Sequence, residues 1–244
     1  MSALIKEQID IIRQRIAEAV RKSGRPASAV RLMAVTKTVD DRRIMQAMAA
    51  GVDVIGENYV QEARRKIELM GKSIAWHLIG HLQTNKAKDA IRLFDMIHSL
   101  DRIELARELD RRSGMAGVAT KVLVEVNISG EKTKRGVAHR DALPLIREVS
   151  ALENLSVQGL MTMPPWFDDP EEARPFFVAL RELKDRVAAE NLPRVQMQEL
   201  SMGMSQDYQV AVEEGATIVR IGRSIFGERE KGLPNPCRSQ MSVR

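Results

Sequence analysis

The stretch Lys121-Val-Leu-Val-Glu-Val-Asn-Ile128 decides the fold class of this chain. It is apolar almost without interruption, and β-branched residues are frequent in it. A strand with one face in water alternates apolar and polar residues, whereas a nearly continuous apolar strand is typical of a parallel sheet that helices cover on both faces. The stretch therefore predicts an α/β protein built on parallel strands.

Strand-like runs of this kind recur along the chain, and amphipathic segments with apolar residues at helical spacing separate them. The predicted strands are Leu32–Thr36, Val52–Gly56, Ala75–Gly80, Met96–Ser99, Lys121–Ile128, Val157–Thr162, Glu199–Met202 and Ile218–Ile221. The predicted helices are Ala3–Lys22, Asp40–Ala50, Glu57–Met70, Thr84–Leu93, Asp101–Arg112, His139–Leu152, Glu171–Asn191 and Ser205–Glu214.

Eight such runs, each followed by a helix or a short connection, predict a single (β/α)8 TIM barrel with an extra N-terminal helix. A doubly wound open sheet is the alternative. The barrel is favoured because candidate ligand contacts gather at strand C-termini, where barrels carry their functional sites. These residues are Lys37, Asn58, His81, Asn127, Met161, Ser201 and Arg220. We assign residues 1–227 to one barrel domain and expect residues 228–244 to be a disordered tail.

The composition is that of a soluble globular protein of 244 residues, with 44% hydrophobic residues, 29% charged residues and a net charge of +5. Mixed charges without a basic stripe argue against nucleic-acid binding. The single cysteine, Cys237, excludes an internal disulfide and offers no metal cluster. No apolar run of about 18 residues predicts a membrane span. The charged N-terminus has no signal-peptide pattern, so we expect a cytoplasmic protein.

Lys37 is the first candidate for chemistry. It ends the run Arg31-Leu-Met-Ala-Val-Thr-Lys37, so a rigid strand delivers its amine at the edge of a loop. Apolar neighbours remove part of the hydration of such a lysine, which disfavours the ammonium form and makes the amine a nucleophile toward carbonyls. A solvated lysine at a strand end is the ordinary alternative.

Two glycine-containing segments predict a phosphate site. Ser201-Met-Gly-Met-Ser205 follows the seventh predicted strand, and Arg220-Ile-Gly-Arg223 ends the eighth. The loops after strands seven and eight are the common phosphate site of barrels, and free N–H groups at a helix start attract anions. Each segment alone is equally explained as a glycine turn. Together with Lys37 they indicate pyridoxal phosphate (PLP) as the ligand.

The other polar segments keep structural alternatives. Asn58 is explained as well by a helix cap, with Gln61 completing a capping box, as by a ligand contact. His77 is most simply a core histidine, Lys134 a member of a charged solvated loop, and Met161 a core residue. The carboxylates Glu57, Glu125 and Glu199 have no spacing that suggests an acid–base pair.

Several motifs in one order resemble the YggS/PROSC family of PLP homeostasis proteins, from the first helix to about Gly227. They are Ala34-Val-Thr-Lys37, Gly56-Glu-Asn58, His77-Leu-Ile-Gly80-His-Leu-Gln83-Thr-Asn85-Lys86, Gly159-Leu-Met161-Thr-Met163, Leu200-Ser-Met-Gly-Met-Ser205 and Val219-Arg-Ile-Gly222. The resemblance implies the alanine racemase-like barrel of the type III PLP fold without the second β-domain of the racemases.

The resemblance also implies roles for individual residues. Lys37 would form a Schiff base with PLP, and Arg220 would approach the pyridine nitrogen. The phosphate would be held by Ser201, Gly222 and Arg223, the last through its backbone N–H. Asn58 and Met161 would lie beside the cofactor, and Lys134 would help cofactor transfer.

As a function, the resemblance implies a non-catalytic PLP carrier that supplies PLP-dependent apoenzymes. We expect a monomer, because nothing like an obligate dimer seam stands out in the sequence. Racemisation needs an acid–base group on each face of the cofactor, and the only tyrosines, Tyr59 and Tyr208, fall at early helix positions. A small PLP-dependent racemase is the first alternative. A barrel that binds phosphosugars without PLP is the second.

Overall fold

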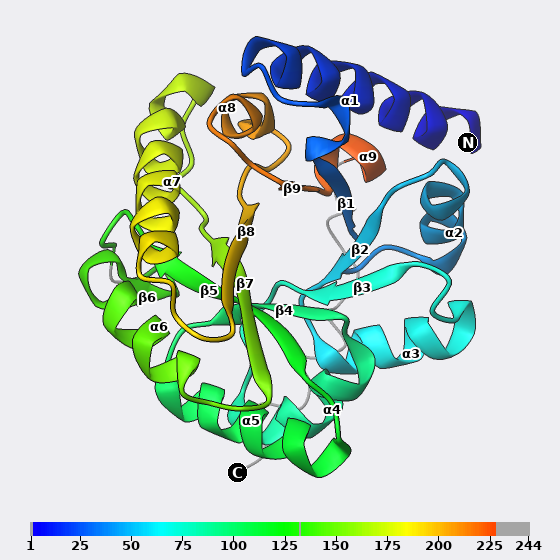
Figure 1. The fold of residues 1–244 in the computed structure, drawn as a ribbon. Helices are drawn as coiled ribbons and strands as arrows, with labels where there is room; N and C mark the ends of the chain where they lie inside the picture. Colours follow the sequence, from blue (N-terminus) through cyan, green and yellow to red (C-terminus); the bar gives the residue numbers. More distant parts are fainter. Residues whose placement is uncertain (1, 132, 228–244) are drawn as a thin grey trace.

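The computed structural model describes residues 2–131 and 133–227. Strands and helices alternate along the chain (Figure 1). The strands are β1 (Arg31–Val35), β2 (Val54–Glu57), β3 (Ala75–Leu78), β4 (Met96–Leu100), β5 (Thr120–Asn127), β6 (Val137–Ala138), β7 (Leu155–Met161), β8 (Val195–Ser201) and β9 (Ile218–Ile221). The α-helices are α1 (Ser2–Lys22), α2 (Asp41–Ala49), α3 (Val60–Met70), α4 (Ala87–Leu93), α5 (Ile103–Ala116), α6 (Ala142–Ser150), α7 (Arg174–Ala189), α8 (Tyr208–Glu213) and α9 (Arg223–Phe226).

The strands close into a barrel, which confirms the predicted fold and excludes the open sheet. The ring runs β1-β2-β3-β4-β5-β7-β8-β9, and every pairing among the described strands is parallel. The last strand returns to the first, with Met33 opposite Arg220. Figure 1 shows the helices arranged around this ring. Helical crossovers between parallel neighbours are the expected connection in such a fold.

Some boundaries differ from the prediction. β8 begins at Val195 rather than Glu199. The prediction missed its first residues because they alternate between exposed and buried positions and lack a continuous apolar run. The helix predicted from Glu57 begins at Val60, since Glu57 is the buried last residue of β2. The two-residue β6 and the four-residue α9 were not predicted; both are shorter than any periodicity can reveal.

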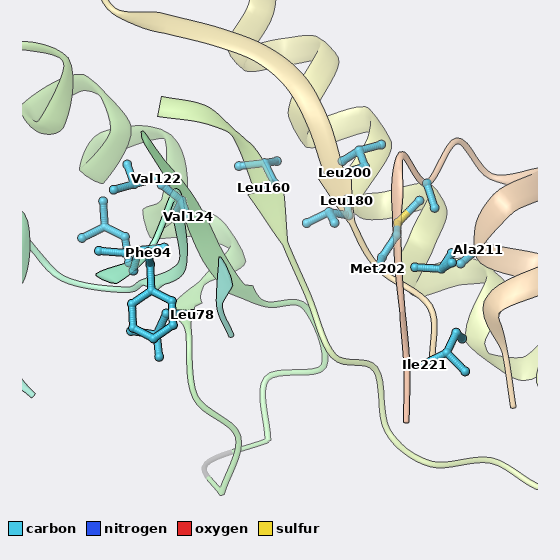
Figure 2. Close-up of a cluster of buried hydrophobic side chains, with 14 of the residues drawn as sticks. Leu78, Phe94, Val122, Val124, Leu160, Leu180, Leu200, Met202, Ala211 and Ile221 are labelled. Carbon is cyan, nitrogen blue, oxygen red and sulfur yellow. The ribbon is translucent and has the colours of Figure 1, made fainter. Parts of the chain in front are cut away.

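The main apolar core lies between the barrel wall and the helices. Figure 2 shows strand residues such as Leu78, Val124 and Leu160 together with Leu180 of α7 and Ala211 of α8. Each fully buried leucine or valine of this kind stabilises the fold by about 1.5–3 kcal/mol.

The extra N-terminal helix completes this layer. Ile5, Ile9, Ile12 and Ile16 of α1 are buried, at a spacing that gathers them on one helix face. α1 contacts α2, α8 and α9, which lie along its inner side in Figure 1. Because α8 has only six residues and α9 only four, α1 supplies cover for the wall where the first and last strands meet.

Alternate strand residues point into the barrel, where the side chains change from apolar to polar. Two small clusters, Met33–Val54–Ile218 and Met96–Leu123–Met161, fill part of the interior. Buried polar residues also lie on these strands, among them His77, His98, Glu125, Ser201 and Arg220. Barrel interiors are ordinarily filled with branched apolar residues, so this polar group points to a functional site.

Within the described part of the chain, every helix is too short or too polar to cross a membrane. The predicted tail, residues 228–244, lies outside the described residues, and so does Cys237.

Candidate functional site

Lys37 stands where the sequence predicts it, just beyond the C-terminal end of β1. Val35 is the last strand residue, Thr36 is fully buried, and Lys37 is half-buried at the start of the loop. β1 pairs with β2 on one side and with β9 on the other. The ends of these two strands therefore flank the lysine.

Gly222 brings the end of β9 close to β1. A Cβ at this position would stand 3.4 Å from the carbonyl oxygen of Val35, at van der Waals distance. Gly222 is followed by α9, whose first residue is Arg223. The predicted phosphate segment thus lies on the strand beside the one that carries Lys37.

The two predicted phosphate segments meet at a pocket lined by Ser205, Gln206, Arg223, Ser224 and Gly227. The backbone N–H of Ser224 donates to Oγ of Ser205 over 3.3 Å, which joins the loop after β8 to the helix after β9. In the first turn of that helix the N–H groups of Ser224, Ile225 and Phe226 already have acceptors within the fold, so the backbone donor that this helix start offers an anion is the N–H of Arg223. The pocket therefore combines hydroxyls, an arginine and a helix start.

Gly203 explains how the first of these segments turns. Its φ is +90°, a left-handed conformation that favours glycine, and a Cβ there would stand 2.6 Å from Cβ of Ala211. The turn lets α8 pack closely against the loop that carries Ser205.

Ser201 does not line this pocket. Its side chain is fully buried, and Nη1 of Arg220 donates to its Oγ over 2.8 Å. Nη2 of Arg220 donates to the carbonyl oxygen of Thr162 over 2.8 Å. Burial lowers the pKa of Arg220 to about 10, so the guanidinium stays charged at neutral pH. The geometry makes Ser201 a support for Arg220, and Ser205 is the serine at the pocket.

Two histidines extend this contact into a hydrogen-bond chain. An arginine can only donate, so Ser201 accepts from Arg220. The Ser201 hydroxyl shares a second hydrogen bond with Nδ1 of His98 over 3.0 Å, and Nε2 of His98 shares one with Nδ1 of His77 over 2.9 Å, with the donor in each set by the histidine tautomers. Burial lowers the pKa of His77 to about 3 and holds that of His98 well below its usual value. Both rings are therefore neutral near pH 7.

This chain confirms the expectation that His77 is a core histidine. His98 was missed, because nothing in the local sequence Met96-Ile-His-Ser-Leu100 distinguishes an inward-facing histidine from any other strand residue.

Asn58 lies at the C-terminal end of β2. The structure excludes the helix-cap alternative: Tyr59 occupies the N-cap position of α3, and no side chain caps it. Oδ1 of Asn58 is buried without a hydrogen-bond partner among the described residues. Gly80 closes in from the β3 loop, and a Cβ there would stand 2.2 Å from the Asn58 carbonyl oxygen. A buried amide oxygen without a donor is costly, so this position suits a ligand that brings one.

The loop that carries Lys134 is tied down rather than simply solvated. Nδ2 of Asn127 donates to the carbonyl oxygens of Glu131 and Lys134. Nζ of Lys134 donates to the carbonyl oxygen of Pro164 over 3.0 Å, which joins this loop to the one after β7. Met161, at the end of β7, is fully buried against Met96 and Leu123, in keeping with core packing.

Three carboxylates that show no partner in the sequence have distinct surroundings in the fold. Glu57 pairs with Lys66, and Glu199 pairs with Arg31 at the start of β1, each over 2.6 Å. Glu125 is buried, and burial raises its pKa to about 7, with the Asp101 carboxylate adding to the shift. Among the described residues, no cluster of histidine, cysteine and carboxylate side chains is arranged to hold a metal.

Comparison with known proteins agrees with this geometry. Residues 8–230 match the family model described as "Alanine racemase, N-terminal domain". A protein of Aquifex aeolicus named pyridoxal phosphate homeostasis protein is 44% identical over 225 residues, which cover 92% of this chain and 98% of the relative. This chain belongs to the pyridoxal phosphate homeostasis protein family. The resemblance inferred from the motifs is thereby confirmed.

Solved structures extend the comparison of this pyridoxal phosphate homeostasis family member. PipY of Synechococcus elongatus, solved with PLP bound, is 35% identical and superposes with a TM-score of 0.80 over 91% of this chain and 100% of PipY. An alanine racemase of Clostridium difficile superposes with a TM-score of 0.72 at 14% identity, over 93% of this chain and 57% of the racemase. The racemase likeness shows a shared fold alone.

Proposed function

We propose that this protein binds PLP covalently at Lys37, holds it reversibly for cellular PLP homeostasis, and does not turn over amino acids. The observation that carries the proposal is the adjacency of an amine and an anion pocket. Lys37 follows β1, and the pocket with Ser205 and Arg223 follows the neighbouring β9 and β8. PLP needs both groups, because it carries a phosphate and an aldehyde that condenses with a lysine amine.

The surrounding residues fit the rest of the cofactor. Asn58 offers a buried oxygen that lacks a donor among the described residues. Arg220, held by Ser201 and Thr162, supplies a fixed cation inside the barrel for the pyridine nitrogen. A cation there disfavours a proton on that nitrogen, which weakens the ring as an electron sink. Met161 and Lys134 complete the proposed surroundings.

For the phosphate we propose Ser205, Gly222 and Arg223, with Ser205 taking the role that the sequence suggested for Ser201. Ser205 lines the pocket, whereas the Ser201 hydroxyl is already shared between Arg220 and His98. Arg223 contributes through its backbone N–H at the start of α9.

A carrier rather than a racemase is supported by the acid–base groups available. Racemisation requires one on each face of the cofactor. Tyr208 is buried in α8, and Tyr59 is partly exposed at the start of α3. Among the described residues, Glu125 is a candidate acid–base group because its pKa is raised to about 7, and it favours residual proton transfer as the second possible function. We propose that the protein is a cytoplasmic monomer that delivers PLP to PLP-dependent apoenzymes.

The test is the visible absorbance of the protein with added PLP, before and after borohydride reduction, with peptide mapping of the product. We expect a reducible adduct on Lys37, none in Lys37→Ala, and phosphate-dependent binding that persists in the variant. An adduct on another lysine would contradict the assignment. Deuterium exchange at Cα of common amino acids, at rates typical of an enzyme, would replace the carrier with a racemase.

A further inference from the structure

A fully buried lysine lies behind the strand that carries Lys37. Lys66, on α3, donates from Nζ to three acceptors: the carbonyl oxygen of Thr36 at 2.6 Å, Oε1 of Glu57 at 2.6 Å and Oε1 of Glu62 at 2.7 Å. An ammonium group has three protons, so each has an acceptor. A buried charge is tolerated when it is paired and hydrogen-bonded in this way.

The network holds the backbone on both sides of Lys37. The peptide group before it is fixed through the Thr36 carbonyl, which accepts from Lys66. The peptide group after it is fixed through the Thr38 N–H, which donates to Oε1 of Glu62 over 2.7 Å. One carboxylate oxygen therefore links the Lys66 ammonium to the far side of Lys37.

Further contacts strengthen the anchor. The Thr36 hydroxyl donates to Glu57, and its N–H donates to the Gly56 carbonyl oxygen over 3.0 Å. Thr38 has a φ of +61°, a left-handed conformation that is uncommon for a β-branched residue and persists only where the surroundings impose it. The Glu62 contact to its N–H is one such constraint.

We propose that Glu62 and Lys66 are positioning residues that aim Lys37 for its reaction with a cofactor aldehyde. The inference rests on the proposed function. As the C=N bond forms, the aldehyde oxygen leaves as water with both protons of the neutral amine, so the amine must approach the carbonyl carbon along a defined path. Fixing the peptide groups before and after Lys37 fixes the position and direction of its Cα–Cβ bond, from which the side chain extends. Apolar side chains often stabilise a core as well as a buried ion cluster does, so stability alone does not explain why charged residues lie here. A role in positioning Lys37 does explain them.

Glu62 offers a test that spares the fold. Its side chain is 20% exposed, and in Glu62→Ala the Lys66–Glu57 ion pair remains. We expect the rate constant for PLP adduct formation to fall about tenfold or more. Glu62→Gln keeps an oxygen that can accept from Thr38 and should recover most of the rate. Affinity for 4-deoxypyridoxine 5'-phosphate, which has no aldehyde, should stay unchanged in both variants.

Glu199 is the matched control. It is 19% exposed, pairs with Arg31 over 2.6 Å and accepts from the Thr217 hydroxyl. Arg31 is the first residue of β1, so Glu199 lies at the opposite end of that strand from Lys37. Glu199→Ala should form the adduct at the wild-type rate. A wild-type rate in Glu62→Ala, or an equal slowing in Glu199→Ala, overturns the positioning role while the proposed function stands. A wild-type protein that forms no adduct overturns both.

Discussion

Arg220 and Ser201 are joined by a 2.8 Å hydrogen bond inside the barrel, and this bond assigns the serine a structural role. Arg220 is buried and charged, and its guanidinium donates to the Ser201 hydroxyl and to the Thr162 carbonyl. The bond also connects Arg220 to the histidines beyond it, since the Ser201 hydroxyl shares a hydrogen bond with His98. Two serines of one glycine segment, Ser201 and Ser205, thus have different surroundings: one is buried beside Arg220 and the other lines the pocket.

Ser201→Ala should lower the free energy of unfolding by about 1–3 kcal/mol, because it leaves a buried donor of Arg220 and a ring nitrogen of His98 unpaired. Urea denaturation measures the change. Ser201→Thr, which keeps the hydroxyl, is the control. Equal stability of the alanine variant and the wild type would show that the hydrogen-bond chain contributes nothing.

Ser205→Ala should leave stability nearly unchanged and weaken PLP binding about tenfold, the effect of losing one hydrogen bond to a charged group. Binding of pyridoxal, which lacks the phosphate, should not change. Titration of both ligands separates the outcomes, and an equal loss for PLP and pyridoxal would remove Ser205 from the phosphate site.

Glu125→Gln should stabilise the protein at pH 8 more than at pH 5. Burial raises the folded pKa of Glu125 to about 7, so between the unfolded value of 4.5 and pH 7 the folded state holds a proton that the unfolded state has lost. The stability contributed by this group is complete below pH 4.5 and is lost as pH rises through 7. The glutamine variant has no such loss, so its advantage grows by about 1–3 kcal/mol. Thermal unfolding across this range gives the measurement, and a pH-independent difference would contradict the shift.

Lys66→Met should cost about 3–5 kcal/mol of folding free energy, because Glu57 is left buried without its cation. Adding Glu57→Met should recover part of the loss, since an apolar pair can replace a buried ion pair. Denaturant unfolding of the wild type and the two variants tests this expectation. A double variant less stable than the single one would show that packing, rather than an unpaired charge, sets the cost.

The fold could be predicted from the sequence because its signals are local. Continuous apolar strands such as Lys121–Ile128 alternate with helical patterns, and eight repeats leave few arrangements other than a barrel. Lys37 could be placed for the same reason, since the end of an apolar strand is visible in the chain. The return of β9 to β1, confirmed by Met33 opposite Arg220, follows from closure of the ring.

Side-chain partners could not be predicted in this way. Glu57 and Lys66 lie on different elements, as do Ser201 and His98, and only the folded backbone brings each pair together. The sequence alone does not distinguish the role of Ser201 from that of Ser205, because both are serines in one short glycine-containing segment. Their difference depends on strand pleat, because Ser201 is the last residue of β8 and faces inward, whereas Ser205 belongs to the following loop.

The closure of the barrel has a consequence for synthesis. Lys37 follows the first strand, and Gly222 with Ser224 follows the last, so a nascent chain emerging from the ribosome cannot assemble the site until nearly the whole barrel has been translated. A ligand that bridges the two ends binds only the closed ring and stabilises it by mass action. A chain that stops before the last strand would therefore not bind the cofactor, whereas a chain with the closed barrel would.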